Sequence, residues 1–219
     1  MLAKGKKIPR TVYIIRHGMR QDYMDSEWSA TAERPHDTPL HETGFQMARE
    51  TALWLTDHKP QAIYCSPYLR TIQTAVTINE SFALKIRIEH GLGEWLNPEW
   101  CEKYPEHITH DEALLQFGDN LDPNYKSVAR TIYPETDEVC YDRCAKAIES
   151  ILANSDDEDE IVLVTHGAAV MFMVRALLKD KEFKVFWPMC SINEMIWDGG
   201  KWTQGYVGHD HLSFKEGDN

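Results

Sequence analysis

The chain has 219 residues, 42% of them hydrophobic and 11% aromatic, which suits one sizeable domain with a real core and excludes a disordered chain. Its 23 basic and 35 acidic residues give a formal net charge of −12, so we expect neither nucleic acid nor a membrane surface as partner, because both need a basic face. The composition includes no apolar run of membrane-spanning length, no secretory signal and only an odd, irregularly spaced set of five cysteines. These features predict a cytoplasmic protein.

The first half of the chain predicts three strands with two helices between them. An apolar run predicts a buried strand at 12–16, and apolar residues at helical spacing predict a helix over 42–58. Strand patterns follow at 62–67 and 85–91, with a helical pattern over 69–82 between them. The polar, turn-rich segment between the first strand and the first helix predicts a loop.

The middle of the chain loses this periodicity. Residues 96–138 carry several prolines and scattered aromatic residues, which predict an irregular or partly helical insertion. We interpret this segment as a lid that governs specificity within a single domain formed by residues 1–219.

The last third of the chain predicts a return to regular structure. The predicted elements are a helix over 139–152, a strand at 161–167, a helix over 168–179 and a strand hairpin formed by 190–197 and 201–207. Strands that alternate with helices predict a three-layer α/β/α sandwich around a mostly parallel sheet.

Side chains that can carry chemistry follow four of the predicted strands. Because the carboxyl ends of parallel strands meet at one edge of a sheet, we expect these side chains to lie together. They are Arg16, His17 and Arg20 after the first strand, Arg70 after the second, Glu94 after the third and His166 at the end of the fourth. Each has an ordinary structural explanation by itself, but the strand-His-Gly pattern occurs twice. The repetition favours a joint site.

Four motifs in this set resemble those of the histidine phosphatase superfamily, also called the phosphoglycerate-mutase-like family. They are RHG at 16–18, CSPYLRTIQTA at 65–75, GLGEW at 91–95 and VTHG at 164–167. Within the superfamily, RHGMRQD at 16–22 and GLGEW resemble the branch of the suppressor-of-T-cell-receptor-signalling phosphatase domains and the ecdysteroid-phosphate phosphatases. The resemblance implies the phosphoglycerate-mutase-like fold and a phosphomonoesterase, and it leaves a homodimer open.

The chemistry of a phosphomonoesterase suits these residues. A neutral His17 would attack phosphorus and form a phosphohistidine, and Glu94 would protonate the leaving oxygen and then activate water. Arg16, Arg20 and Arg70 would bind the phosphoryl oxygens in bidentate fashion.

A protonated His166 would give the phosphoryl group a further donor, and Gly18 would permit a close backbone approach. No metal or other cofactor is expected, because the guanidinium groups neutralise the phosphate. The predicted catalytic residues are therefore His17, Glu94, His166, Arg16 and Arg70, and the predicted substrate-binding residues are Arg16, Arg20, Arg70 and His166.

The composition of residues 96–138 bears on the substrate. The segment holds ten acidic residues but only Lys103, Lys126 and Arg130 as bases, so a lid of this kind would repel a second anionic group. Its aromatic residues, together with Trp95, favour a bulky or aromatic leaving group, as in phosphotyrosine, aryl or steroid phosphates. Two alternatives stay open: a phosphoglycerate-type mutase, and a non-catalytic member that binds phospho-ligands or serves as a scaffold.

Three positions depart from the pattern or carry no assigned role. Met19 stands where many family members have Glu, which bears on substrate range, and His41 stands where Thr is common before a helix, which predicts a weaker helix cap. Ser66 is interpreted as part of a turn before Pro67 rather than as a phosphate donor.

Overall fold

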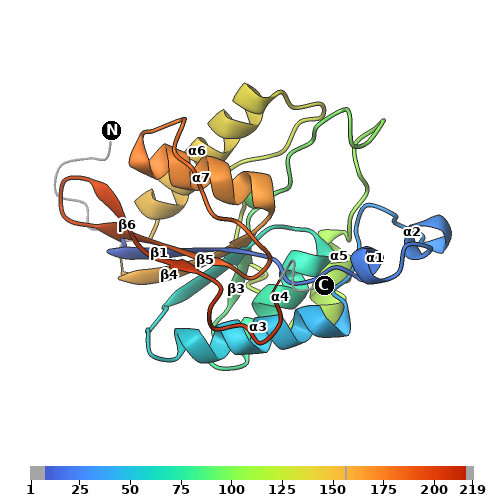
Figure 1. The fold of residues 1–219 in the computed structure, drawn as a ribbon, viewed down its shortest axis with the longest axis horizontal. Helices are drawn as coiled ribbons and strands as arrows, with labels where there is room; N and C mark the ends of the chain where they lie inside the picture. Colours follow the sequence, from blue (N-terminus) through green and yellow to red (C-terminus); the bar gives the residue numbers. More distant parts are fainter. Residues whose placement is uncertain (1–7, 156, 216–219) are drawn as a thin grey trace.

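A six-stranded sheet forms the middle layer of the computed structural model, which describes residues 8–155 and 157–215 (Figure 1). The strands lie in the order β3-β2-β4-β1-β5-β6. Their bounds are β1 Thr11–Arg16, β2 Ala62–Cys65, β3 Ile86–Ile88, β4 Glu160–Thr165, β5 Ile192–Trp197 and β6 Trp202–Gly208. β1 to β4 run parallel to one another, and β5 and β6 form an antiparallel hairpin beside β1. The mostly parallel sheet predicted from the sequence is confirmed.

Helices cover both faces of this sheet (Figure 1). One face carries α3 Glu42–Leu55 and α4 Leu69–Asn79, and the other carries α6 Asp137–Ala153 and α7 Gly167–Leu178. The molecule is therefore the expected three-layer sandwich of the phosphoglycerate-mutase-like fold. The short helices α1 Gln21–Met24 and α2 Trp28–Thr31 lie in the segment that the sequence predicts as a loop.

The alternation of side chains along β1 explains its continuous apolar sequence. Val12 and Ile14 pack into the core beneath α6 and α7, while Tyr13 and Ile15 pack into the core beneath α3 and α4. A strand that is buried on both faces needs apolar residues at every position. The predicted strand at 85–91 is shorter in the structure, because residues beyond β3 form the 3₁₀ turn η1 His90–Leu92.

The segment 96–138 is irregular around one helix, α5 His110–Phe117, as its weak periodicity predicts. Thr109 begins this helix with a capping box, in which its hydroxyl accepts from the backbone of Glu112 and the Glu112 carboxylate accepts from the backbone of Thr109. No helix among residues 8–155 and 157–215 is long and apolar enough to cross a membrane.

The structure shows where the two residues that differ from the family pattern lie. His41 is the N-cap residue of α3, and its Nδ1 accepts from the backbone N–H of Thr43 at 3.1 Å, so the side chain does cap the helix, and the weaker strength of this cap stays a prediction. Met19 is buried in a small apolar cluster with Met47 and Met189, where it does not line the pocket described below.

Candidate active site

The order of the strands brings the two predicted histidines together. β1 and β4 are neighbours, with Arg16 opposite Thr165 in the parallel register, so His17 and His166 leave the sheet side by side. The backbone N–H of His17 donates to the carbonyl oxygen of Thr165 at 2.9 Å. The two imidazole rings lie 5.4 Å apart between centroids, and the residues are 1% and 0% exposed. The pairing expected from the repeated motif is present.

His17 is held with one ring nitrogen bonded and the other without a partner. Its Nδ1 lies 2.8 Å from the carbonyl oxygen of Gly18, and because a carbonyl only accepts, Nδ1 carries the proton. Nε2 then carries the lone pair, and it makes no hydrogen bond to any described residue. Burial, followed by the charges of Arg70 and Arg16, lowers the pKa of His17 well below its usual value. His17 is therefore a neutral imidazole, as a nucleophile requires.

The loop after β1 is fixed by a close contact between two glycines. A Cβ atom at Gly18 would lie 2.6 Å from the carbonyl oxygen of Gly44, and a Cβ atom at Gly44 would lie 2.3 Å from that of Met19. The Gly18 N–H also donates to Thr74 Oγ1 on α4 at 3.1 Å. The sequence predicted a close backbone contact at Gly18, and in the structure this contact is with Gly44 in the first turn of α3. The contact holds the loop that carries His17 against α3.

Arg70 lies in the first turn of α4 and is almost fully buried. Its Nη1 donates to the carbonyl oxygen of His36 at 3.2 Å, and its Nη2 donates to Nδ1 of His166 at 3.1 Å. Its Nε is buried and has no hydrogen-bond partner among the described residues. Burial, followed by the nearby Arg20, lowers the pKa of Arg70, so the site concentrates positive charge in a desolvated place.

Arg16 and Arg20 are each oriented by an aromatic ring. Nη1 of Arg16 donates to the carbonyl oxygen of Trp187 at 3.2 Å, and its guanidinium carbon lies 5.3 Å from the centre of the Trp187 ring. Arg20 forms two hydrogen bonds with the carboxylate of Asp22 and lies 4.5 Å from the ring centre of Tyr23. The aromatic partners and the Asp22 carboxylate restrict both guanidinium groups.

Gly167 makes room for one of these rings. A Cβ atom there would lie 2.7 Å from the Trp187 ring, so a larger residue would displace the tryptophan that supports Arg16. The glycine of the second His-Gly pair therefore leaves room for the ring that packs on Arg16.

His166 differs from the sequence prediction in its charge. Its Nδ1 accepts from Arg70, because a guanidinium only donates, and its Nε2 therefore carries a proton that it donates to Ser66 Oγ at 2.7 Å. Burial, followed by the charges of Arg70 and His17, lowers the pKa of His166 well below its usual value. His166 is neutral in this structure, and the expectation of a protonated imidazole is wrong. The Ser66 side chain orients this ring, a role that the sequence did not indicate.

Glu94 faces the histidines from the loop after η1. Its Oε2 lies 3.6 Å from Nδ1 of His166 and 4.0 Å from Nη2 of Arg70, and its Oε1 accepts from the backbone N–H of Trp95 at 3.0 Å. The side chain is 22% exposed, so the carboxylate is accessible from the pocket that it lines. The structure thus brings all six predicted side chains to one place.

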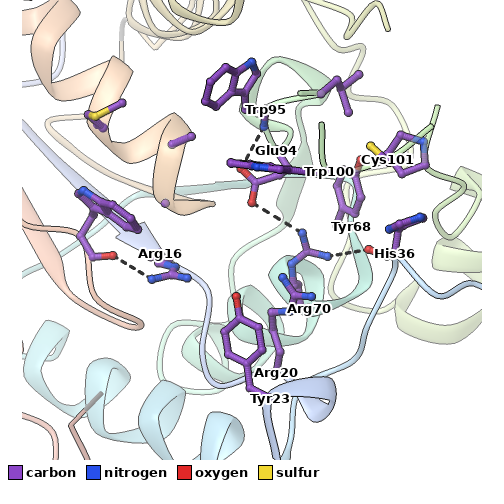
Figure 2. A pocket seen from close by; sticks show the side chains of 16 residues that line it. Arg16, Arg20, Tyr23, His36, Tyr68, Arg70, Glu94, Trp95, Trp100 and Cys101 are labelled. Atoms are coloured by element: carbon purple, nitrogen blue, oxygen red, sulfur yellow. Dashed lines mark hydrogen bonds and ion pairs between the residues drawn. The ribbon is translucent and has the colours of Figure 1, made fainter. Parts of the chain in front are cut away.

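A pocket of about 570 Å³ is lined by Arg16, Arg20, Arg70 and Glu94 of this cluster, while the two buried histidines lie outside its lining (Figure 2). Its walls are rich in aromatic rings, and its lining residues are Arg16, Arg20, Tyr23, His36, Tyr68, Arg70, Glu94, Trp95, Leu96, Trp100, Cys101, Pro105, Gly167, Ala168, Met171 and Trp187. Glu94 is the only carboxylate in this lining, so none of the ten acidic residues of segment 96–138 lies in it. The sequence indicated the aromatic residues of this segment but not Tyr23, Tyr68 or Trp187, which come from other parts of the chain.

Comparison with known proteins identifies the superfamily to which the chain belongs. A profile described as "Histidine phosphatase superfamily (branch 1)" matches residues 12–208. The transcription factor tau 55 kDa subunit of Saccharomyces cerevisiae is 30% identical over 209 residues, which cover 85% of this chain and 44% of that protein. The human ubiquitin-associated and SH3 domain-containing protein A is 29% identical over 153 residues, or 65% of this chain and 23% of that protein. The chain spans less than half the length of these curated relatives.

The fold is also found in solved structures. The crystal structure of the ecdysone phosphate phosphatase, EPPase, from Bombix mori in complex with tungstate has a TM-score of 0.74 with 21% identity, covering 90% of this chain and 92% of that chain. Together with the profile match, these similarities show that the chain belongs to the histidine phosphatase superfamily. The resemblance stated from the motifs is confirmed.

Proposed function

We propose that the chain is a phosphomonoesterase that acts through a phosphohistidine on His17. The observation that carries the proposal is the geometry of that side chain: Nδ1 is bonded to the carbonyl of Gly18, and Nε2 has no hydrogen bond to any described residue and lies beside the buried guanidinium of Arg70. An imidazole that is held in one tautomer, next to cations that can neutralise a phosphate, has the properties of a phosphoryl acceptor.

The first step transfers the phosphoryl group to the enzyme. The lone pair of His17 Nε2 attacks phosphorus, the bond from phosphorus to the ester oxygen breaks, and the proton of a protonated Glu94 goes to that oxygen. Arg16, Arg20 and Arg70 bind the non-bridging oxygens, and the buried Nε of Arg70 gains an acceptor. The products are the free alcohol or phenol and the phosphohistidine.

The second step returns the enzyme to its starting state. Glu94, now a carboxylate, accepts a proton from water while the water oxygen attacks phosphorus, and the bond from phosphorus to Nε2 breaks. His17 is released as a neutral imidazole, Glu94 is again protonated, and inorganic phosphate leaves. His166 would gain a proton or realign its Nε2–H only when a dianion enters, because Arg70 and Ser66 hold both ring nitrogens.

The lining of the pocket supports a bulky or aromatic monoester as the substrate. Trp95, Trp100, Tyr68, Tyr23 and Trp187 provide ring faces around the arginines. A phosphotyrosine-type, aryl or steroid phosphate would bury its leaving group against these rings. A mutase acting on a phosphoglycerate needs a second anion site next to the first, and the pocket supplies no lysine for it.

A non-catalytic role is the second candidate, and one observation favours it. The relative from Saccharomyces cerevisiae is named as a subunit of a transcription factor, which is a role in an assembly. The presence of all six predicted side chains and the neutral imidazole of His17 favour catalysis over this alternative. A homodimer and a cytoplasmic location stay predictions, as does independence from a metal.

Turnover of p-nitrophenyl phosphate by the wild-type chain and by His17→Ala tests the proposal. We expect hydrolysis by the wild type and none by the variant, with a similar melting temperature for both. An inactive wild type that still binds tungstate would favour the non-catalytic alternative, and isomerisation of 3-phosphoglycerate would favour the mutase.

A further inference from the structure

A buried ion pair lies behind the loop that carries Glu94. Arg143 projects from α6 and Glu135 precedes that helix, and the two are 7% and 1% exposed. Nε of Arg143 donates to Oε1 of Glu135 at 2.5 Å, and Nη2 donates to Oε2 at 2.8 Å. Neither residue lines the pocket, and the side chains of both are bonded to each other and to the backbone of the loop that carries Glu94.

The remaining donors of Arg143 hold the backbone on the amino-terminal side of Glu94. Nη1 donates to the carbonyl oxygens of Gly91 at 2.9 Å and Gly93 at 3.1 Å, and Nη2 donates to the carbonyl oxygen of Glu94 itself at 3.1 Å. A planar guanidinium presents these donors in a fixed fork, so one side chain sets the relative position of three carbonyl groups.

Glu135 holds the carboxyl-terminal side of the same loop. Its Oε2 accepts from the backbone N–H of Leu96 at 3.1 Å, and its own N–H donates to the carbonyl oxygen of Leu96 at 3.0 Å. Its carbonyl oxygen accepts from Nε1 of Trp95 at 3.0 Å. The ion pair therefore fixes the chain on both sides of Glu94.

The carboxylate of Glu94 depends on that backbone for its position. Its Oε1 is bonded to the N–H of the next residue, and its Oε2 approaches His166 and Arg70 only at 3.6 Å and 4.0 Å. A buried ion pair is weak support for stability, because desolvation offsets much of its attraction, whereas a fixed geometry is something it can supply. We propose that Arg143 and Glu135 are positioning residues that aim Glu94 at the leaving oxygen. The inference rests on the proposed function.

The test compares a poor leaving group with a good one. Protonation by Glu94 matters more for phenyl phosphate than for p-nitrophenyl phosphate, because p-nitrophenolate leaves without much help. Arg143→Lys keeps the positive charge beside Glu135 but cannot bond the three carbonyl groups together. We expect kcat/KM, which reports formation of the phosphohistidine, to fall about tenfold to a hundredfold with phenyl phosphate and less than about threefold with p-nitrophenyl phosphate.

Glu94→Gln provides the reference for this pattern, and the double variant tests the coupling. If Arg143 acts through Glu94, then adding Arg143→Lys to Glu94→Gln causes no further loss. An equal loss with both esters, no loss with either, or a multiplicative loss in the double variant would overturn the inference.

Two further variants keep the result interpretable. Arg87→Lys removes an arginine that is bonded to Tyr64 and Glu158 and does not line the pocket, so it should change neither ester's kcat/KM. If Arg143→Lys fails to fold, the paired variant Arg143→Met with Glu135→Leu removes both charges together and should show the same dependence on leaving group. A wild type that hydrolyses neither ester would overturn the proposed function itself, and the inference with it.

Discussion

The two strand-His-Gly segments have the same local sequence but present their imidazoles in different ways. At the end of β1, Nδ1 of His17 is hydrogen-bonded to the carbonyl oxygen of Gly18, and Nε2 has no hydrogen bond to any described residue. At the end of β4, His166 is bonded at both ring nitrogens, to Arg70 and to Ser66. Both rings are buried, and burial lowers both pKa values. The partner of each nitrogen, rather than the motif or the burial, distinguishes the proposed nucleophile from the proposed supporting imidazole.

Replacement of His17 should have the largest effect. His17→Asn removes the nucleophile while leaving an amide that can bond Gly18, so we expect kcat to fall at least about 1,000-fold, with no covalent intermediate. Steady-state hydrolysis of p-nitrophenyl phosphate measures this. Comparable residual activity in His17→Asn and His166→Asn would remove the distinction between the two rings.

Replacement of His166 should cost less, because it removes a donor and a positioning contact but leaves the nucleophile. We expect His166→Asn to lower kcat about 100-fold and still to form the phosphohistidine slowly. Single-turnover kinetics with mass spectrometry checks both parts. A variant that forms no intermediate at any time would show that His166 is itself the acceptor or is needed for the nucleophile's geometry.

Replacement of Ser66 tests the comparison, because it removes the hydrogen-bond partner of Nε2 in His166 and so leaves that nitrogen as it is in His17. Ser66→Ala leaves Nε2 of His166 without its acceptor, and we expect kcat to fall about tenfold because the ring can rotate or change tautomer. Nitrogen chemical shifts of labelled histidine report the tautomer, and Ser81→Ala on an exposed turn is the control. An unchanged His166 spectrum in Ser66→Ala would contradict the assignment.

The smallest expected effect is the loss of folding stability that the two buried imidazoles cause at low pH. Because the folded-state pKa values of His17 and His166 are lowered, the unfolded state binds more protons below about pH 6.5, and folding stability falls as the pH drops through that value. Each ring should cost roughly 1 kcal/mol between about pH 7.5 and pH 5.5. Urea unfolding of the wild type and of the His17→Gln, His166→Gln double variant measures this difference.

The double variant should lose less stability on acidification than the wild type. Part of the slope should persist in it, because burial also lowers the pKa of His90, and that of His211 to about 4. Equal slopes for the two proteins would mean that the two imidazoles bind protons equally in the folded and unfolded states, which contradicts lowered pKa values in the folded protein.

The sequence predicted which strand ends meet, because apolar runs, alternating helices and the edge rule for parallel sheets are properties of the chain itself. It therefore found His17, His166, Arg70 and Glu94 together. It could not predict the hydrogen bond from His166 to Ser66, because that contact joins residues 100 positions apart. The neutral state of His166 escaped prediction for the same reason.

The residues that line the pocket were also only partly predictable from the sequence. Trp187 supports Arg16 from a loop before β5, and nothing in its local sequence indicates that role. The acidic composition of segment 96–138 predicted a negatively charged lid, yet its lining residues in the pocket are Leu96, Trp100, Cys101 and Pro105. Composition counts residues, whereas the pocket depends on which side chains turn inward.

Trapping the covalent intermediate tests the central claim most directly. A single turnover of an aryl phosphate, quenched in base where phosphohistidine survives and analysed by mass spectrometry with fragmentation, should place the phosphoryl group on His17. Phosphorus–nitrogen coupling in the labelled protein should place it on Nε2. A phosphoryl group on His166, on Nδ1 of His17, or on no residue of an actively hydrolysing enzyme would contradict the account.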